Sequence, residues 1–84
     1  MSPQVVHAPE KQRFELELGG HTAILEYRMD GGSIVFTHTG VPKAIGGRGI
    51  GSQLARAGLE YARANGYRVR PLCWFVAGYI ERHQ

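Results

Sequence analysis

The chain has 84 residues, a formal net charge of +3 and a sequence pI near 9.4. This length allows one domain with a modest core, and the single cysteine excludes an intramolecular disulfide framework. No apolar run approaches the ~20 residues that a membrane-spanning helix needs, and the first residues lack the pattern of a signal peptide. We therefore expect a cytoplasmic protein, whose mild positive charge fits an anionic ligand or an ordinary domain.

The first residues are mostly polar and include Pro3 and Pro9. We predict a flexible tail over 1–12 and a single domain over 13–84. The domain begins with RFELEL, residues 13–18, in which apolar and charged side chains alternate. Alternation with a period of two is typical of a strand with one buried face.

A pair of glycines predicts the first hairpin. Gly19-Gly20 fits a two-residue turn, and the resulting register gives three cross-strand pairs: Leu18 with His21, Leu16 with Ala23, and Phe14 with Leu25. A second turn at 30–32 leads into the run SIVFTHTGV, residues 33–41, which is rich in β-branched and aromatic side chains. We expect Ile34, Phe36 and His38 to lie on the apolar face of this antiparallel sheet.

The stretch VPKAIGGRGIGS, residues 41–52, joins this sheet to a helix. Its glycines let backbone amides approach a ligand, and the helix that begins near 49–52 favours an anion such as phosphate. Gly46 and Gly51 have the spacing of a P-loop, but Ser52 stands where the lysine is needed. The dinucleotide fingerprint also fails, because 47–51 reads G-x-G-x-G and no long βαβ unit with a distal acidic residue follows. A glycine-rich turn without a ligand is the alternative interpretation.

Helical spacing then continues through SQLARAGLEYARANG, residues 52–66, where Arg56 and Glu60 can pair and Gly66 suits a left-handed cap. Gly58, inside this helix, indicates close packing against the sheet. YRVRPLC, residues 67–73, predicts a fourth strand, and WFVAGYIERH, residues 74–83, a short terminal helix. The fold class is therefore α/β or α+β, with a mainly antiparallel sheet of about four strands and one main helix.

Three side chains could carry chemistry. Cys73 precedes the terminal helix, whose dipole would lower the pKa of a nucleophilic thiol, but Cys73 also fits a small buried hydrophobic residue. His38 suits a general base, or a hydrogen-bonded structural histidine. Tyr79 could protonate a leaving thiolate, or pack in the core.

The other histidines and the arginines predict no further site. His7, His21 and His83 have no spacing that would bind a metal with another ligand, so we expect no metal site. Arg68 and Arg70 share one side of the fourth strand and could form a basic surface with Arg56 and Arg63. Without interleaved exposed aromatic residues, nucleic-acid binding is not expected.

Three motifs in this order of elements carry a family resemblance. They are His38-Thr39-x-Val41-Pro42, the G-x-G-I-G run before the helix, and Pro71-x-Cys73 followed by Val76 and Tyr79-Ile80 before Arg82-His83. Over residues 14–83 the chain resembles the small acyl-CoA N-acetyltransferase-like proteins, a reduced form of the GCN5-related N-acetyltransferase (GNAT) fold.

The resemblance implies that the chain binds acetyl-CoA and transfers its acetyl group to an amine, which could belong to a protein lysine, a polyamine or a small amine. It implies that Val41 contacts the pantetheine arm and that Cys73 and His38 lie near the acetyl group. The pyrophosphate would be held by the backbone of Gly47, Arg48, Gly49, Ile50, Gly51 and Ser52.

Two features depart from the full-size family. Its signature, Arg/Gln-x-x-Gly-x-Gly/Ala, matches at Gly49 and Gly51, but Gly46 stands where Arg or Gln is usual. Lys43 or Arg48 could supply the missing phosphate contact. The chain also lacks the first helices and much of the sheet that build the acceptor pocket.

These departures leave several alternatives open. The acetyl group could pass through Cys73 or go directly to the amine. The chain could instead be a coenzyme-A-binding module without efficient catalysis, or a small basic interaction domain for a protein or nucleic acid. A partly open sheet is also compatible with a homodimer.

Overall fold

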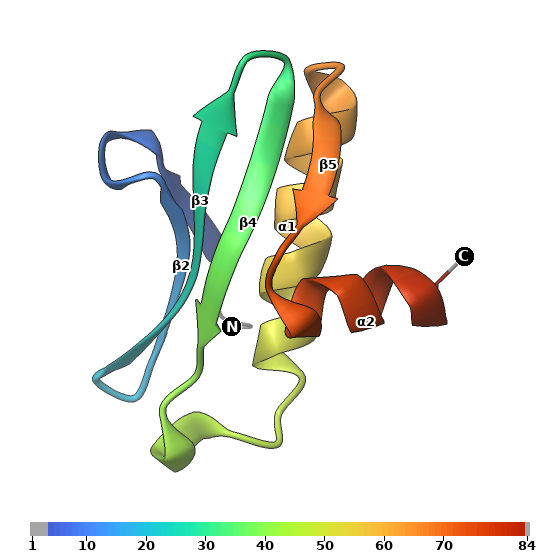
Figure 1. The fold of residues 1–84 in the computed structure, drawn as a ribbon. Helices are drawn as coiled ribbons and strands as arrows, with labels where there is room; N and C mark the ends of the chain where they lie inside the picture. The colour runs from blue at the N-terminus through green and yellow to red at the C-terminus, as the bar shows by residue number, and fades with distance from the viewer. Residues whose placement is uncertain (1–3, 84) are drawn as a thin grey trace.

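The computed structural model describes residues 4–83, which form a five-stranded sheet with helices beside it (Figure 1). The elements in chain order are β1 (Val5–Ala8), the 3-10 helix η1 (Pro9–Lys11), β2 (Arg13–Leu18), β3 (His21–Asp30), β4 (Ser33–Gly40), the 3-10 helix η2 (Lys43–Ile45), α1 (Ile50–Ala64), β5 (Arg68–Pro71) and α2 (Trp74–Arg82). The predicted mixed α and β fold is confirmed. Neither α1 nor α2 is long and apolar enough to cross a membrane.

The strands lie in sequence order, β1-β2-β3-β4-β5. The first four are antiparallel, and β5 is parallel to β4 because α1 carries the chain back between them. In Figure 1, α1 runs behind the sheet, and α2 crosses below the end of β5. The predicted hairpin register is confirmed: Leu18 pairs with His21, Leu16 with Ala23, and Phe14 with Leu25.

The predicted N-terminal tail is wrong for the part that the structure describes. Val5–Ala8 forms β1, which adds a fifth strand through pairs such as Val5 with Leu16. His7 adds side-chain contacts to this pairing, because its ring stacks on Phe14 at a centroid distance of 4.3 Å and its Nε2 lies 2.5 Å from the Tyr27 hydroxyl. Residues 1–3 of the expected tail lie outside the described residues.

The core lies between α1 and the inner face of the sheet. Its largest fully buried side chains come from both layers: Phe36, Leu16, Leu25, Ile34, Leu54 and Val76 among them. Gly58 makes the close approach predicted for it, because a Cβ atom there would lie 2.8 Å from Cε1 of Phe36. The helix can therefore sit this near the sheet only without a side chain at position 58.

A β-bulge in β4 overturns the expected face of His38. Tyr27 pairs with Phe36 while its neighbour Glu26 pairs with His38, so Thr37 is an extra residue in β4. Because side chains alternate between faces, one extra residue reverses the faces of all residues that follow. The expectation that His38 shares the buried face of Phe36 is therefore wrong, and the His38 side chain is exposed on the outer face.

Candidate functional site

The two C-terminal strands separate after Phe36. β5 pairs with β4 only from Ser33 to Phe36. The backbone N–H groups of Leu72 and Cys73 then both donate to the Phe36 carbonyl oxygen, at 3.0 Å each, and the chain turns away from β4. Within residues 4–83, the rest of β4 has no strand partner on this side, which leaves backbone donors and acceptors there for a ligand.

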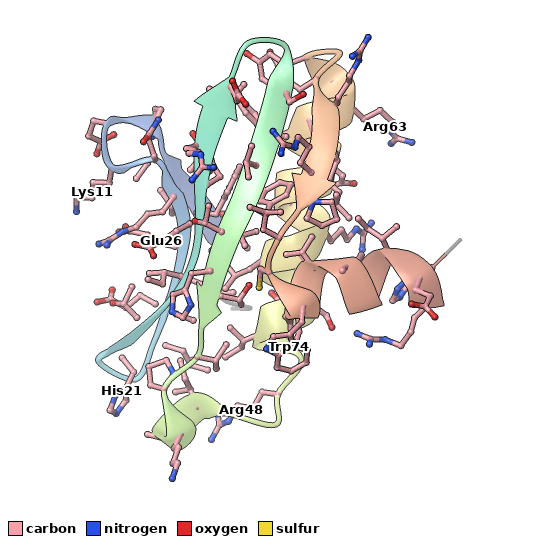
Figure 2. The ribbon with its side chains drawn as sticks, in the orientation of Figure 1. Lys11, His21, Glu26, Arg48, Arg63 and Trp74 are labelled. Carbon is pink, nitrogen blue, oxygen red and sulfur yellow. The ribbon has the colours of Figure 1, made fainter. Side chains whose placement is uncertain are left out.

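A cavity of about 400 Å³ lies where the strands part. It is lined by Thr37, His38, Thr39, Val41, Leu72, Cys73, Trp74 and Phe75. The structure thus brings His38 and Cys73, which are 35 positions apart in the sequence (73 − 38), to one cavity. Figure 2 shows Trp74 at the beginning of α2, above the glycine loop.

Cys73 is the N-cap residue of α2 and is buried. Its Sγ lies 3.1 Å from Oγ1 of Thr39, a residue that the bulge turns toward the inner face. Burial raises the pKa of the Cys73 thiol, but hydrogen bonds from Thr39 and from the backbone N–H groups of Val76 and Phe75 outweigh it, and the pKa lies below its ordinary value. A lower pKa gives more thiolate, the nucleophilic form.

A second cavity, of about 520 Å³, lies over the glycine loop. It is lined by Val41, Lys43, Gly46, Gly47, Gly49, Ile50, Gly51, Ser52, Phe75 and Arg82. Val41 and Phe75 line both this cavity and the one that contains Cys73, so the two cavities adjoin. Together they connect the beginning of α1 to the beginning of α2.

The glycines of this loop have different structural roles. Gly49 is the N-cap of α1 with φ +72°, and no side chain caps the free N–H groups of the first turn. A Cβ atom at Gly47 or Gly49 would meet nothing within 4 Å, so the space beside these backbones is open. At Gly51 a Cβ atom would lie 2.5 Å from Cζ of Phe75, and this glycine therefore lets α2 pack against α1.

The cations at the loop differ partly from those expected. Lys43 lines the cavity, and so does Arg82 from α2, which belongs to the last of the family-like motifs but was not expected to contact phosphate. Arg48 is exposed on the same loop but is not one of the lining residues (Figure 2). Positive charge at a helix N-terminus reinforces its attraction for phosphate.

Tyr79 lies away from the Cys73 cavity. It lines a separate hollow of about 280 Å³ between α1 and α2, where its ring stacks on His83 at 4.0 Å. Part of its side chain also packs against the core. This position favours the packing alternative for Tyr79 over a role as an acid.

The surface arginines do not form an unbroken basic patch. The predicted ion pair is present, with Nε of Arg56 3.7 Å from Oε2 of Glu60. A second ion pair joins Nη1 of Arg70 to Oδ2 of Asp30 at 3.1 Å. Within residues 4–83, His, Cys, Asp and Glu side chains do not gather in any group of three or more that could hold a metal ion.

Sequence reasoning assigned no role to Thr39, Trp74 or Phe75. Thr39 was part of a recognised motif, but its contact with Cys73 depends on the bulge, which leaves no distinct pattern in β4. Phe75 was expected only in an apolar stripe, and its packing on Gly51 is a contact between helices far apart in the chain. For Trp74, the one available signal was its position next to Cys73.

Comparisons with known proteins agree with this architecture. A family model described as GCN5-related N-acetyl-transferase matches residues 13–84. Protein NATD1 of Gallus gallus is 34% identical over 83 residues, which cover 95% of this chain and 76% of the relative. Protein NATD1 of Homo sapiens is 32% identical, with 95% and 74% covered. The NMR structure of a GCN5-like protein from Staphylococcus aureus has a TM-score of 0.73 at 28% identity, covering 95% of this chain and 79% of that one.

Proposed function

Since the chain belongs to the GCN5-related N-acetyltransferase family, we propose that it binds acetyl-CoA and transfers the acetyl group to an amine. The observation that carries this proposal is the pair of adjoining cavities, which join the glycine loop to Cys73 through Val41 and Phe75. One end suits a phosphate and the other suits a thioester, as the two ends of acetyl-CoA require.

The pyrophosphate belongs at the glycine loop. Backbone N–H groups at the beginning of α1 are free of side-chain caps, and the open space at Gly47 and Gly49 admits an anion close to the backbone. Lys43 and Arg82 add charge in the same cavity, which compensates for Gly46 at the usual Arg or Gln position. The backbone of residues 47–52 would hold the phosphates, as predicted from the sequence.

The pantetheine arm belongs along the unpaired side of β4. Its amides can use the backbone groups of β4 that β5 leaves free beyond Phe36, with Val41 at the junction of the cavities. The acetyl end then reaches the cavity of Cys73 and His38. This arrangement orients the thioester before the amine arrives, which supplies the proximity on which acyl transfer depends.

Two routes lead from this arrangement to the product. In the direct route, the neutral amine nitrogen bonds to the acetyl carbon, the carbon–sulfur bond breaks, the nitrogen loses a proton and the coenzyme A sulfur gains one. In the covalent route, the Cys73 thiolate first accepts the acetyl group and releases coenzyme A, and the amine then takes the acetyl group from Cys73. His38, exposed at the cavity, is the base that we propose for the amine proton in both routes.

An NMR amide titration tests the binding proposal. Acetyl-CoA should shift the amide signals of residues 47–52, Val41 and Cys73, whereas ATP, an anionic control without pantetheine, should shift only the loop signals. Equal and scattered shifts with both ligands, or none, would contradict the proposed site. Binding without turnover of any amine would indicate the coenzyme-A-binding module instead.

Intact-mass measurement separates the two routes. The wild-type protein incubated with acetyl-CoA should gain one acetyl group if Cys73 is acylated, and Cys73→Ala should gain none. Amine acetylation by a protein that never carries an acetyl group would support direct transfer.

The cytoplasmic location and the homodimer stay predictions.

A further inference from the structure

Two large apolar side chains are exposed on either side of the buried Cys73. Leu72 is 61% exposed and Trp74 is 83% exposed, although both line the cavity that contains the Cys73 thiol. Exposing an indole to this extent forgoes a large gain from burial, and such residues commonly mark binding surfaces. Neither side chain belongs to the core cluster, so stability does not explain their positions.

The chemistry of the cavity limits which amine can bind there. Apolar side chains supply half of its lining residues, and Thr37, His38 and Thr39 supply its polar groups. No aspartate or glutamate lines it, within the part of the chain that the structure describes. A polyamine or a lysine-rich segment would therefore find no carboxylate for its second charge among the lining residues, and the net charge of +3 adds repulsion. Glu26 pairs with His38 between β3 and β4 but is not one of these lining residues.

We infer that Trp74 and Leu72 form the binding platform for the acceptor, and that the acceptor is a monoamine with an aromatic or branched aliphatic body. This inference rests on the proposed function. The body of the acceptor packs against the indole and Leu72, and its single nitrogen points into the cavity toward His38 and the thioester. Burying apolar surface, rather than pairing charges, then provides the specificity.

Steady-state acetylation, followed by mass detection of the product, tests the platform. The wild-type protein should acetylate phenethylamine and isoamylamine with at least tenfold higher kcat/KM than ethylamine or spermidine. Trp74→Ala should raise the KM for phenethylamine at least tenfold and change the KM for acetyl-CoA less than twofold, whereas Trp74→Phe should restore most of the activity. Val6→Ala removes an exposed apolar side chain from β1, at the other edge of the sheet, and should change neither value.

Fluorescence gives a readout that does not depend on turnover. Trp74 is the only tryptophan of the chain, so emission excited at long wavelength reports on this side chain alone. Phenethylamine added to the protein saturated with coenzyme A should change the intensity or the wavelength of this emission. Leu72→Ala should weaken the response, because it removes the other half of the platform.

The outcomes separate this inference from the proposed function. A preference for spermidine or for a lysine peptide would overturn the inference, and so would an equal loss with all amines in Trp74→Ala. If acetyl-CoA shifts the loop amides but phenethylamine leaves the fluorescence unchanged, the inference fails and the proposed function stands. If acetyl-CoA produces no shifts at the loop, the proposed function fails and the inference falls with it.

Discussion

The Thr39 hydroxyl is the side chain that most directly sets the state of the Cys73 thiol. It lies 3.1 Å from Sγ, and its hydrogen bond lowers the pKa of the thiol against the effect of burial. We expect Thr39→Val to raise this pKa, because burial remains while one donor to the thiolate is lost. The alkylation rate with iodoacetamide, measured as a function of pH, should then reach its midpoint at a higher pH in the variant than in the wild-type protein.

The matched control for this prediction is Thr22→Val, which removes an exposed hydroxyl from β3. Its alkylation profile should coincide with that of the wild-type protein. If Thr39→Val also leaves the profile in place, the backbone N–H groups of α2 alone control the thiol.

Gly49 and Gly51 should respond differently to substitution. Valine at position 49 would project into open space beside the amides and force a side chain into the left-handed region, so we expect at least tenfold weaker binding of acetyl-CoA, about 1.4 kcal/mol. Alanine at position 51 would collide with Phe75, which we expect to cost about 1–3 kcal/mol of unfolding free energy. Calorimetric titration and urea unfolding measure the two effects.

Gly31→Val separates backbone strain from loss of the ligand contact. Gly31 has φ +61° and open surroundings, but it lies in the turn between β3 and β4. The variant should lose stability and keep its affinity for acetyl-CoA. Equal affinity of the Gly49→Val and Gly31→Val variants would mean that the phosphates bind elsewhere.

At the scale of elements, β1 contains His7, whose pKa is lowered so that its neutral form is favoured in the folded state. Burial lowers the pKa of His7, and the nearby Glu10 opposes this only in part. His7 therefore binds a proton less readily in the folded state than in the unfolded chain, where an unperturbed histidine has a pKa of about 6.5. Stability from this group is complete above that pH and is lost as the pH falls below it.

Urea unfolding between pH 8 and pH 5 measures this dependence. The unfolding free energy of the wild-type protein should fall more steeply with decreasing pH than that of His7→Gln, which cannot take up the proton. Both proteins keep the same carboxylates, so the difference isolates His7. Parallel curves would show that protonated His7 is tolerated beside Phe14 and Tyr27.

The elements differ in how far the sequence could predict them. The β2–β3 hairpin and its register followed from alternation and from Gly19-Gly20, which are local signals. β1 was missed because VVHA is short and lies between prolines, whereas its pairing with β2 and the contacts of His7 with Phe14 and Tyr27 are tertiary and leave no local signal. The bulge at Thr37 arises from the pairing of β3 with β4, and the predicted face of His38 was wrong for that reason.

At the scale of the whole molecule, the candidate site is formed by segments that lie far apart in the sequence. The glycine loop and Cys73 were recognised as motifs, but their connection through Val41 and Phe75 depends on how α2 packs against α1. Gly51 permits this packing because it has no side chain, and the sequence around it does not predict the contact with Phe75. Motifs therefore named the candidate residues, whereas the packing of α2 determines which of these candidates lie together.

The distribution of charge over the molecule gives the last prediction. If acetyl-CoA binds at the glycine loop, the double variant Lys43→Gln/Arg82→Gln should weaken its affinity about tenfold or more, because both side chains line that cavity. Arg63→Gln/Arg68→Gln removes the same charge, lowering the net charge from +3 by two, from exposed positions outside the glycine-loop cavity. This control should keep nearly the wild-type affinity, and calorimetric titrations at two salt concentrations compare the two double variants.

An equal loss in both variants would mean that acetyl-CoA responds to the overall positive charge, as a basic interaction domain would require. A loss confined to the first variant, together with a weaker dependence on salt, would assign the binding to the two cations that line the glycine-loop cavity.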